Sequence, residues 1–202
     1  AKSTKEDYII LAEGYMDVIA IQQAGFENVV ATLGTALTQE QARLLSTYTS
    51  NIVIAYDSDE AGQKATRRAI EIFEQVGLKV KVLSITGAKD PDEYIKKYGS
   101  ARFKLLIEGS DDATVYTLQK IKQKCNVETP AGKVDYLRQA AKVLAELPGY
   151  VEREIYASRL ASEMEVTKEA VLLEVKSVLQ KKKREKDKKE RKDLKIAGTV
   201  MG

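Results

Sequence analysis

Short apolar runs alternate with helix-like segments along the first part of the chain, up to about residue 108. The pattern contains strand candidates at 8–12, 29–33, 51–56 and 79–85, and helix candidates at 16–24, 38–48, 61–75 and from 90 onward. Such alternation predicts an α/β fold, with a mainly parallel, Rossmann-like sheet and helices on both of its faces. Thr38 is expected to cap one of these helices, and Pro91 to lie in the first turn of another.

The chain beyond residue 109 shows a different pattern. Apolar residues such as Val134, Leu137, Ala141 and Leu144 recur there at helical spacing, which favours a small helical bundle over a ligand groove. The helices of this bundle are predicted at 111–124, 131–147, 150–164 and 168–183. We therefore expect three regions, which are an α/β domain at 1–108, a helical bundle at 109–180 and a charged tail at 181–202.

Positive charge is concentrated in that tail. Between Lys181 and Lys195 there are ten Lys or Arg and four Asp or Glu, a net charge of +6, whereas the whole chain carries +3 and the rest therefore −3. Such a segment attracts nucleic acid electrostatically. Because its charges are mixed, we interpret it first as a solvated connector or a frayed extension of the last helix.

The residues that are rare in this sequence restrict its chemistry. The chain has no His and a single Cys, Cys125, so it can form neither an internal disulfide nor a zinc site of Cys and His ligands. Any bound metal must be held by oxygen ligands, which favours Mg²⁺, Mn²⁺ or Ca²⁺. The sequence also has neither a signal-peptide pattern nor an apolar run of membrane-spanning length, so a cytoplasmic protein without a membrane partner is expected.

Acidic groups follow three of the predicted strands. Glu13 follows the first strand, Asp57 and Asp59 follow the third, and Asp90 and Asp92 lie beyond the fourth. In an open parallel sheet, ligands bind beyond the carboxyl ends of the strands. The three groups are therefore expected at one edge of the sheet.

The middle group shows why this pattern indicates a metal. Asp57 and Asp59 point the same way from an extended backbone and repel each other unless a cation lies between them. Glu13 would add a third carboxylate, and Gly62 would let the next turn approach closely. Acidic residues after a strand are also common helix caps. Their joint occurrence on two strands, in a chain without His, favours the metal site over simple capping.

Four motifs carry a family resemblance. These are Glu13-Gly14-Tyr15-Met16-Asp17, the segment 31–36 (ATLGTA), the segment 57–62 (DSDEAG) and the segment 89–93 (KDPDE). In order and spacing they resemble the TOPRIM domain of bacterial replicative DNA primases. Residues 151–156 and 160–163 resemble the helical subdomain that follows this domain in those enzymes, so the resemblance covers roughly residues 7–180.

The resemblance implies a metal-dependent enzyme that makes short RNA primers. Its partners would be a single-stranded DNA template, ribonucleoside triphosphates and the RNA primer. Glu13, Asp57 and Asp59 match the family's catalytic metal ligands for Mg²⁺ or Mn²⁺, Asp90 and Asp92 match assisting acids, and Gly14, Asp17 and Gly62 match supporting positions. For binding phosphates we consider Lys89 and three basic residues that share one face of a helix, Lys64, Arg67 and Arg68.

Parts of the family pattern are expected to be missing. The chain contains no Cys/His zinc module, and neither the basic half of the polymerase domain nor the C-terminal helicase-binding domain is expected in it. We therefore expect a fragment that does not make primers alone and whose parent contacts a replicative helicase through the missing domain. A nuclease or topoisomerase of the TOPRIM class, and a non-catalytic module that recruits nucleic acid, remain alternatives.

Overall fold

The computed structural model describes residues 7–32 and 36–200, with side chains through residue 190. The chain divides into two compact units, Ala1–Tyr116 and Thr117–Gly202. Part of the predicted 29–33 strand and of the 31–36 motif, namely residues 33–35, lies outside the described residues. Within the described part of the chain, no helix is both long and apolar enough to cross a membrane.

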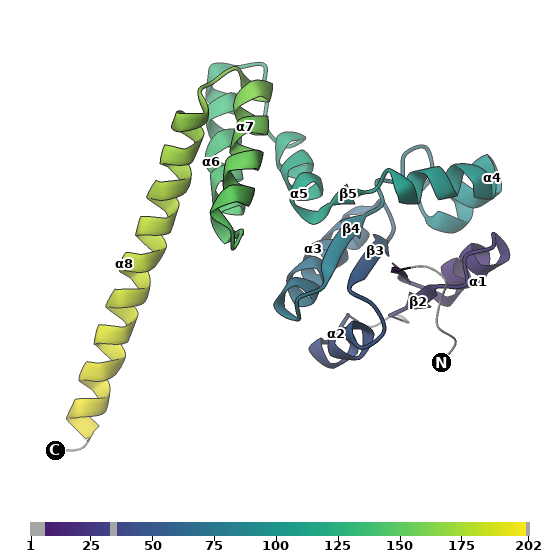
Figure 1. The fold of residues 1–202 in the computed structure, drawn as a ribbon, viewed down its shortest axis with the longest axis horizontal. Coiled ribbons are helices and arrows are strands. Elements are labelled where there is room, and N and C mark those ends of the chain that lie inside the picture. Colours follow the sequence, from purple (N-terminus) through teal and green to yellow (C-terminus); the bar gives the residue numbers. More distant parts are fainter. Residues whose placement is uncertain (1–6, 33–35, 201–202) are drawn as a thin grey trace. The chain divides into compact units, whose positions relative to one another are not determined.

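The first unit is built on a five-stranded sheet in the order β2-β1-β3-β4-β5 (Figure 1). Its first four strands are parallel to one another, and β5 runs antiparallel to β4. The strands are β1 (Ile9–Ala12), β2 (Val29–Ala31), β3 (Asn51–Ala55), β4 (Lys79–Val82) and β5 (Asp111–Asp112). The expected α/β fold with a mainly parallel sheet is therefore confirmed.

Helices cover both faces of this sheet, because successive side chains of a strand point to opposite faces. Ile52 and Ile54 of β3 pack in one core with side chains of α2 (Gln39–Ser46) and α3 (Glu60–Gln75). Val53 and Ala55 pack in the other core, with side chains of α1 (Tyr15–Gln23) and α4 (Pro91–Glu108).

Local signals account for most helix ends. The Thr38 hydroxyl accepts a hydrogen bond from the Gln41 amide at 3.2 Å, and Gln41 reaches back to the Thr38 amide at 3.0 Å, so α2 begins with a capping box. Pro91 is the first residue of α4, as expected. The helix predicted at about 111–124 is present, but it begins two residues later, at Ala113. Asp111 and Asp112 pair with β4, and the Asp112 carboxylate caps the next helix by accepting from the Val115 amide at 2.9 Å.

The second unit is a helical bundle. The helices are α5 (Ala113–Lys122), which begins in the first unit, α6 (Pro130–Glu146), α7 (Tyr150–Met164) and α8 (Lys168–Val200). Their core includes the fully buried side chains of Tyr136, Leu144 and Leu160. The last helix runs much further than the predicted 168–183, so the tail expected at 181–202 is helical through Val200.

Candidate metal centre

Glu13 and Asp57 lie at the ends of neighbouring strands. In the parallel pair β1–β3, Ala12 is in register with Ala55, so the residues that follow both strands emerge at the same edge of the sheet. The Glu13 side chain is partly buried, and its Oε1 atom is buried without a hydrogen-bond partner within the part of the chain that the structure describes. A buried carboxylate oxygen of this kind is costly unless something binds it. The atom is therefore available to a cation.

The electrostatics of these carboxylates favour a cation as well. Burial, followed by the charges of Asp17, Asp90 and Asp59, raises the pKa of Asp57 to about 6. The pKa of Glu13 is raised by burial first and then by the charges of Asp57, Asp59 and Asp17. A hydrogen bond from the Asp57 backbone lowers this pKa in part. Burial is therefore the main cause of both pKa shifts, and repulsion between acidic groups of the three motifs adds to it.

Asp59 has a structural role in the same loop. Its Oδ1 atom accepts a hydrogen bond from the Gly62 amide at 2.7 Å and so caps α3. Gly62 lies against the backbone of Asp57, where an added Cβ would be 2.2 Å from the Asp57 carbonyl oxygen. Only glycine allows this approach, which holds the start of α3 against the residue that follows β3.

Asp17 connects the first motif to the third. Its Oδ2 atom accepts from the Gly14 amide at 3.3 Å, which closes the first turn of α1 just after Glu13. Burial raises the pKa of Asp17, the Gly14 amide lowers it, and the nearby charges of Asp90 and Asp92 raise it. Asp17 is thus in electrostatic contact with both acids of the third motif.

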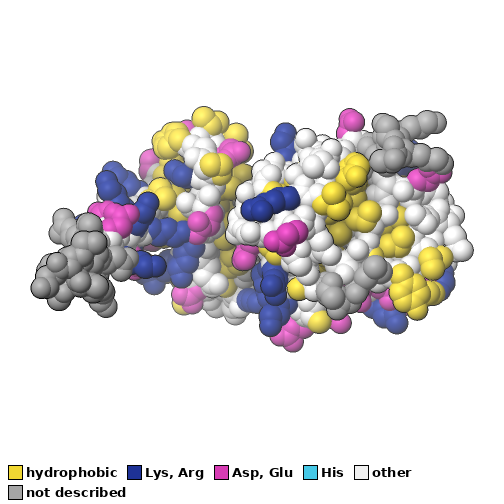
Figure 2. All heavy atoms as spheres, turned by 90° about the horizontal axis from the view of Figure 1, so that it is seen from below, with side chains coloured by type: hydrophobic (Ala, Val, Ile, Leu, Met, Phe, Trp, Pro, Cys, Tyr) yellow, Lys and Arg dark blue, Asp and Glu magenta, His cyan; other side chains and the backbone are white. Residues whose placement is uncertain are grey.

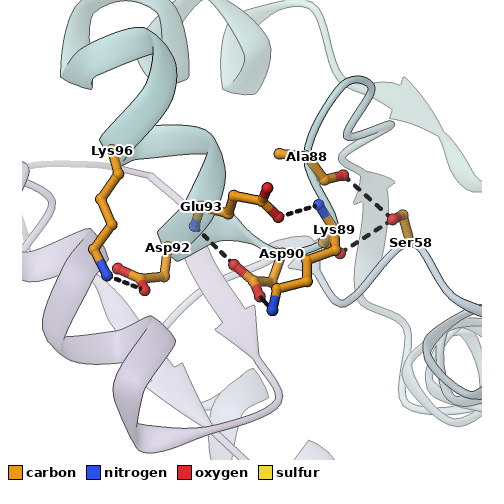
Figure 3. A network of polar contacts seen from close by, with 7 residues as sticks. All are labelled: Ser58, Ala88, Lys89, Asp90, Asp92, Glu93 and Lys96. Atoms are coloured by element: carbon orange, nitrogen blue, oxygen red, sulfur yellow. Dashed lines mark hydrogen bonds and ion pairs between the residues drawn. The ribbon is translucent and has the colours of Figure 1, made fainter.

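The third motif is held by its own hydrogen bonds (Figure 3). The Asp90 Oδ1 atom accepts from the Glu93 amide at 2.7 Å and caps α4, and Glu93 in turn accepts from the Lys89 amide at 3.0 Å. Asp92 forms an ion pair with Lys96 at 2.6 Å, one turn along the helix. Asp92 is therefore paired with a protein cation, whereas Glu13 and Asp57 form no ion pair among the described side chains, although the charge of Lys89 lowers the pKa of Asp57 in part.

Ser58, the residue between the two aspartates, has a role that the sequence pattern does not predict. Its amide donates to the Lys89 carbonyl oxygen at 2.9 Å, and its hydroxyl donates to the same oxygen at 3.1 Å and to that of Ala88 at 3.4 Å (Figure 3). These bonds join the loop after β3 to the loop before α4. The only signal in the sequence was a hydroxyl between two acids, which does not identify a distant backbone partner.

The basic candidates do not gather at the site. Lys89 is largely exposed, and its Nζ atom is 3.8 Å from Asp90 Oδ2, beside the third motif. Lys64, Arg67 and Arg68 are exposed on α3. Arg68 lies nine residues beyond the Asp59 cap, about 13 Å along the helix axis, and lines an open cleft with α2.

The acidic side chains are not arranged as a preformed cage. In the described part of the chain, no three His, Cys, Asp or Glu side chains are grouped closely enough to hold a metal ion. The orphan oxygen of Glu13 and the raised pKa values of Glu13 and Asp57 nevertheless fit a site for a hard divalent cation.

A parallel sheet with this acidic edge is the arrangement of a Toprim-type domain. A family model described as Toprim-like matches residues 10–95, and a second, described as the DnaB-helicase binding domain of primase, matches residues 115–169. The chain is 39% identical over 186 residues to a DNA primase of Halalkalibacterium halodurans, and 36% identical over 170 residues to that of Clostridium acetobutylicum. These alignments cover 90% and 84% of this chain but only 30% and 28% of the relatives.

Solved structures agree with these matches. The Aquifex aeolicus primase, in a structure of its zinc-binding and RNA polymerase domains, matches with a TM-score of 0.61 at 34% identity, covering 84% of this chain and 40% of that one. A DNA primase domain from Pseudomonas aeruginosa matches with a TM-score of 0.67 at 31% identity, covering 86% of this chain and 56% of that one. The chain belongs to the bacterial DNA primase family, in which it corresponds to the Toprim part of the catalytic core and the region after it.

One expectation about this region was wrong. The helicase-binding domain was expected to be missing, but residues 115–169 match the family model of that domain. The error arose because the helices of this region were interpreted only as a packed bundle. Their apolar spacing shows that they pack together and contains no signal for a partner.

The raised pKa of Asp57 predicts how stability depends on pH without metal. Because the folded-state pKa of about 6 exceeds the ordinary value of 3.8, the group stabilises the fold below about pH 4, and this contribution is lost as the pH rises through 6. In EDTA at pH 7.5, Asp57→Asn should raise the free energy of unfolding by on the order of 1 kcal/mol, allowing for solvent screening. At pH 4.5 this gain should shrink. Urea unfolding at both pH values measures it.

Asp112→Asn is the matched control, because it removes one charge and retains an oxygen that can cap the following helix. A gain for Asp57→Asn that is equally large at both pH values, or no larger than the control's, would contradict the repulsion at the candidate site.

Proposed function

We propose that this chain supplies the metal-binding part of an active site that joins ribonucleotides into short RNA primers on single-stranded DNA. The observation that carries the proposal is the pair Glu13 and Asp57, whose carboxylates share one edge of the sheet without an ion-pair partner among the described side chains, Glu13 Oε1 being buried without a hydrogen bond. The relatives are named DNA primases, and one similar structure, at 27% identity, is of a primase catalytic domain bound to single-stranded DNA.

In this proposal Glu13, Asp57 and Asp59 hold Mg²⁺ or Mn²⁺, and Asp90 and Asp92 assist. A bound divalent ion neutralises the triphosphate and stabilises the charge that develops during nucleotidyl transfer. The surrounding residues keep the carboxylates in place. Gly62 lets α3 approach Asp57, and Asp17 ties the loop of Glu13 to the third motif.

Basic side chains would act on the phosphates of the substrates. Lys89 is the strongest candidate, because its flexible ammonium group lies beside Asp90 and is largely free in solvent. Lys64 lies one turn into α3 and is the next nearest along that helix, whereas Arg67 and Arg68 lie further from the carboxylates. The partners in this proposal are template DNA, ribonucleoside triphosphates and the RNA primer, and residues 115–169 would contact the replicative helicase.

Metal binding can be measured on this chain directly. Calorimetric titration should show weak Mn²⁺ binding by the wild type and at least tenfold weaker binding by Asp57→Asn/Asp59→Asn. Asparagine caps helices as well as aspartate does, so α3 should persist in the variant. The control Asp111→Asn/Asp112→Asn removes the same charge from β5 and should bind as the wild type does. Equal Mn²⁺ affinity in all three proteins would refute the assignment.

Ser58 is expected to act by positioning. Ser58→Ala keeps the amide bond to Lys89 but loses both hydroxyl bonds, so Mn²⁺ affinity should fall several-fold while the free energy of unfolding changes by less than about 1 kcal/mol. Ser58→Thr, which keeps the hydroxyl, should restore part of the affinity. The control is Ser46→Ala, which removes a comparable 2.8 Å bond to the Arg43 carbonyl. Unchanged affinity in Ser58→Ala would show that the junction of the two loops has no effect on metal binding.

Activity must be tested in a full-length primase that contains these residues. There, Glu13→Gln should reduce primer synthesis at least a hundredfold, because the amide keeps the shape of the side chain but lacks the charge needed at the metal. Template binding and the thermal unfolding midpoint should change little. Primer synthesis at the wild-type level would remove Glu13 from the catalytic set.

A further inference from the structure

The last helix has two different sides. Val171 and Val175 are buried in the bundle, and Val178 and Leu179 pack against the same core. Lys182 then forms an ion pair with Glu146, the last residue of α6. Beyond this pair α8 continues to Val200 (Figure 1). Every described side chain from Lys181 to Glu190 is exposed. The helix therefore extends past the end of its neighbour.

Three cations lie on one face of this extension. At 3.6 residues per turn, Lys181, Arg184 and Lys188 fall within about 60° of one another around the helix axis. We call these three residues the basic stripe. From its centre the acidic residues between Lys181 and Glu190 are about 65°, 95° and 155° away, at Glu185, Asp187 and Glu190 respectively. The stripe is thus continuous positive charge, and it faces away from the apolar side of α8.

The stripe is also free of internal partners. Lys182 is paired with Glu146, and Lys186 is 3.9 Å from Glu190, but no stripe residue has an acidic partner among the described side chains. Figure 2 shows Lys and Arg side chains gathered along this part of α8. The sequence continues the same spacing with Arg191, Lys192 and Lys195. Charge of one sign that is left unpaired and exposed attracts a ligand of opposite sign.

We propose that the basic stripe of α8 binds the sugar-phosphate backbone of nucleic acid. Residues 180–193 contain no apolar side chain, so this surface lacks both the anchors typical of protein interfaces and the apolar face of a membrane-inserted amphipathic helix. Its cations instead recur every 4.5–6 Å along a straight axis, by the helical rise of about 1.5 Å per residue, which suits a linear polyanion. Such contacts carry no base specificity and weaken steeply with salt.

The test compares two triple variants with the same loss of charge. Lys181→Gln/Arg184→Gln/Lys188→Gln removes the stripe. Lys183→Gln/Lys186→Gln/Lys189→Gln removes three cations from the side of the helix that also bears Asp187 and Glu190. Glutamine is a good helix former, so circular dichroism should show α8 intact in both variants. All measurements are made in EDTA, so the result does not depend on the candidate metal site.

Fluorescence anisotropy with a labelled 20-nucleotide oligo-dT reports binding over a series of salt concentrations. At low salt the stripe variant should bind the oligonucleotide about tenfold more weakly than wild type does. The affinity of the control variant should fall less than threefold. The slope of log K against log salt should fall by about 2 in the stripe variant, since three phosphate contacts on a single strand contribute about 0.7 each. A DNA duplex and an RNA–DNA hybrid, run in parallel, identify which backbone binds most tightly.

Several results would overturn the proposal. Equal losses in the two triple variants would mean that net charge alone attracts the oligonucleotide. Binding of a polyaspartate peptide, or of vesicles rich in phosphatidylserine, as tight as that of the oligonucleotide would assign the stripe to an acidic protein or to a membrane. Wild-type affinity in the stripe variant would place nucleic-acid binding elsewhere on the chain.

Discussion

Like charges held side by side are the constraint on which the first unit depends. The register of β1 with β3 brings Glu13 and Asp57 to one edge, where burial, and after it the repulsion between acidic groups, raises the pKa values of both. The surrounding structure resists this repulsion. Gly62 lies against the Asp57 backbone, Asp59 and Asp90 cap the adjoining helices, and Ser58 bonds one loop to the next. The arrangement costs stability in the absence of a cation, which is typical of a site organised for binding.

Much of this site was predictable because its chemistry is local. The strand ends, the Thr38 cap, the position of Pro91 and the carboxylates after β1 and β3 follow from short-range patterns of apolar and acidic residues. Ser58 was not predictable, since its partners lie about thirty residues away and are backbone atoms. The pairing of β5 with β4 was not predicted for a similar reason, because two aspartates have little strand propensity and their pairing is set by tertiary contacts. The length of α8 was underestimated because its extension has no apolar periodicity.

The two units present different electrostatic problems to a nucleic-acid substrate. The edge of the sheet is acidic and repels phosphate until a cation is bound, whereas the α8 extension is basic and attracts phosphate without one. In the proposed function the first property confines chemistry to the metal-loaded state. The second would hold a strand loosely in any state, so binding and catalysis would respond to different ions.

The helix caps of Asp59 and Asp90 have a consequence for metal selectivity. In each residue one carboxylate oxygen already accepts a backbone amide, at 2.7 Å in both cases, so the other oxygen is the one left to coordinate. Ligands that each offer a single oxygen leave most of a cation's coordination shell to water. Ca²⁺ favours six to eight oxygens and often takes carboxylates bidentately, whereas Mg²⁺ readily keeps its waters and exchanges some of them for phosphate oxygens. In the proposed function, a site in which Asp59 and Asp90 are half used as caps would therefore discriminate against calcium, and nucleotide phosphates would complete the coordination shell of the bound cation.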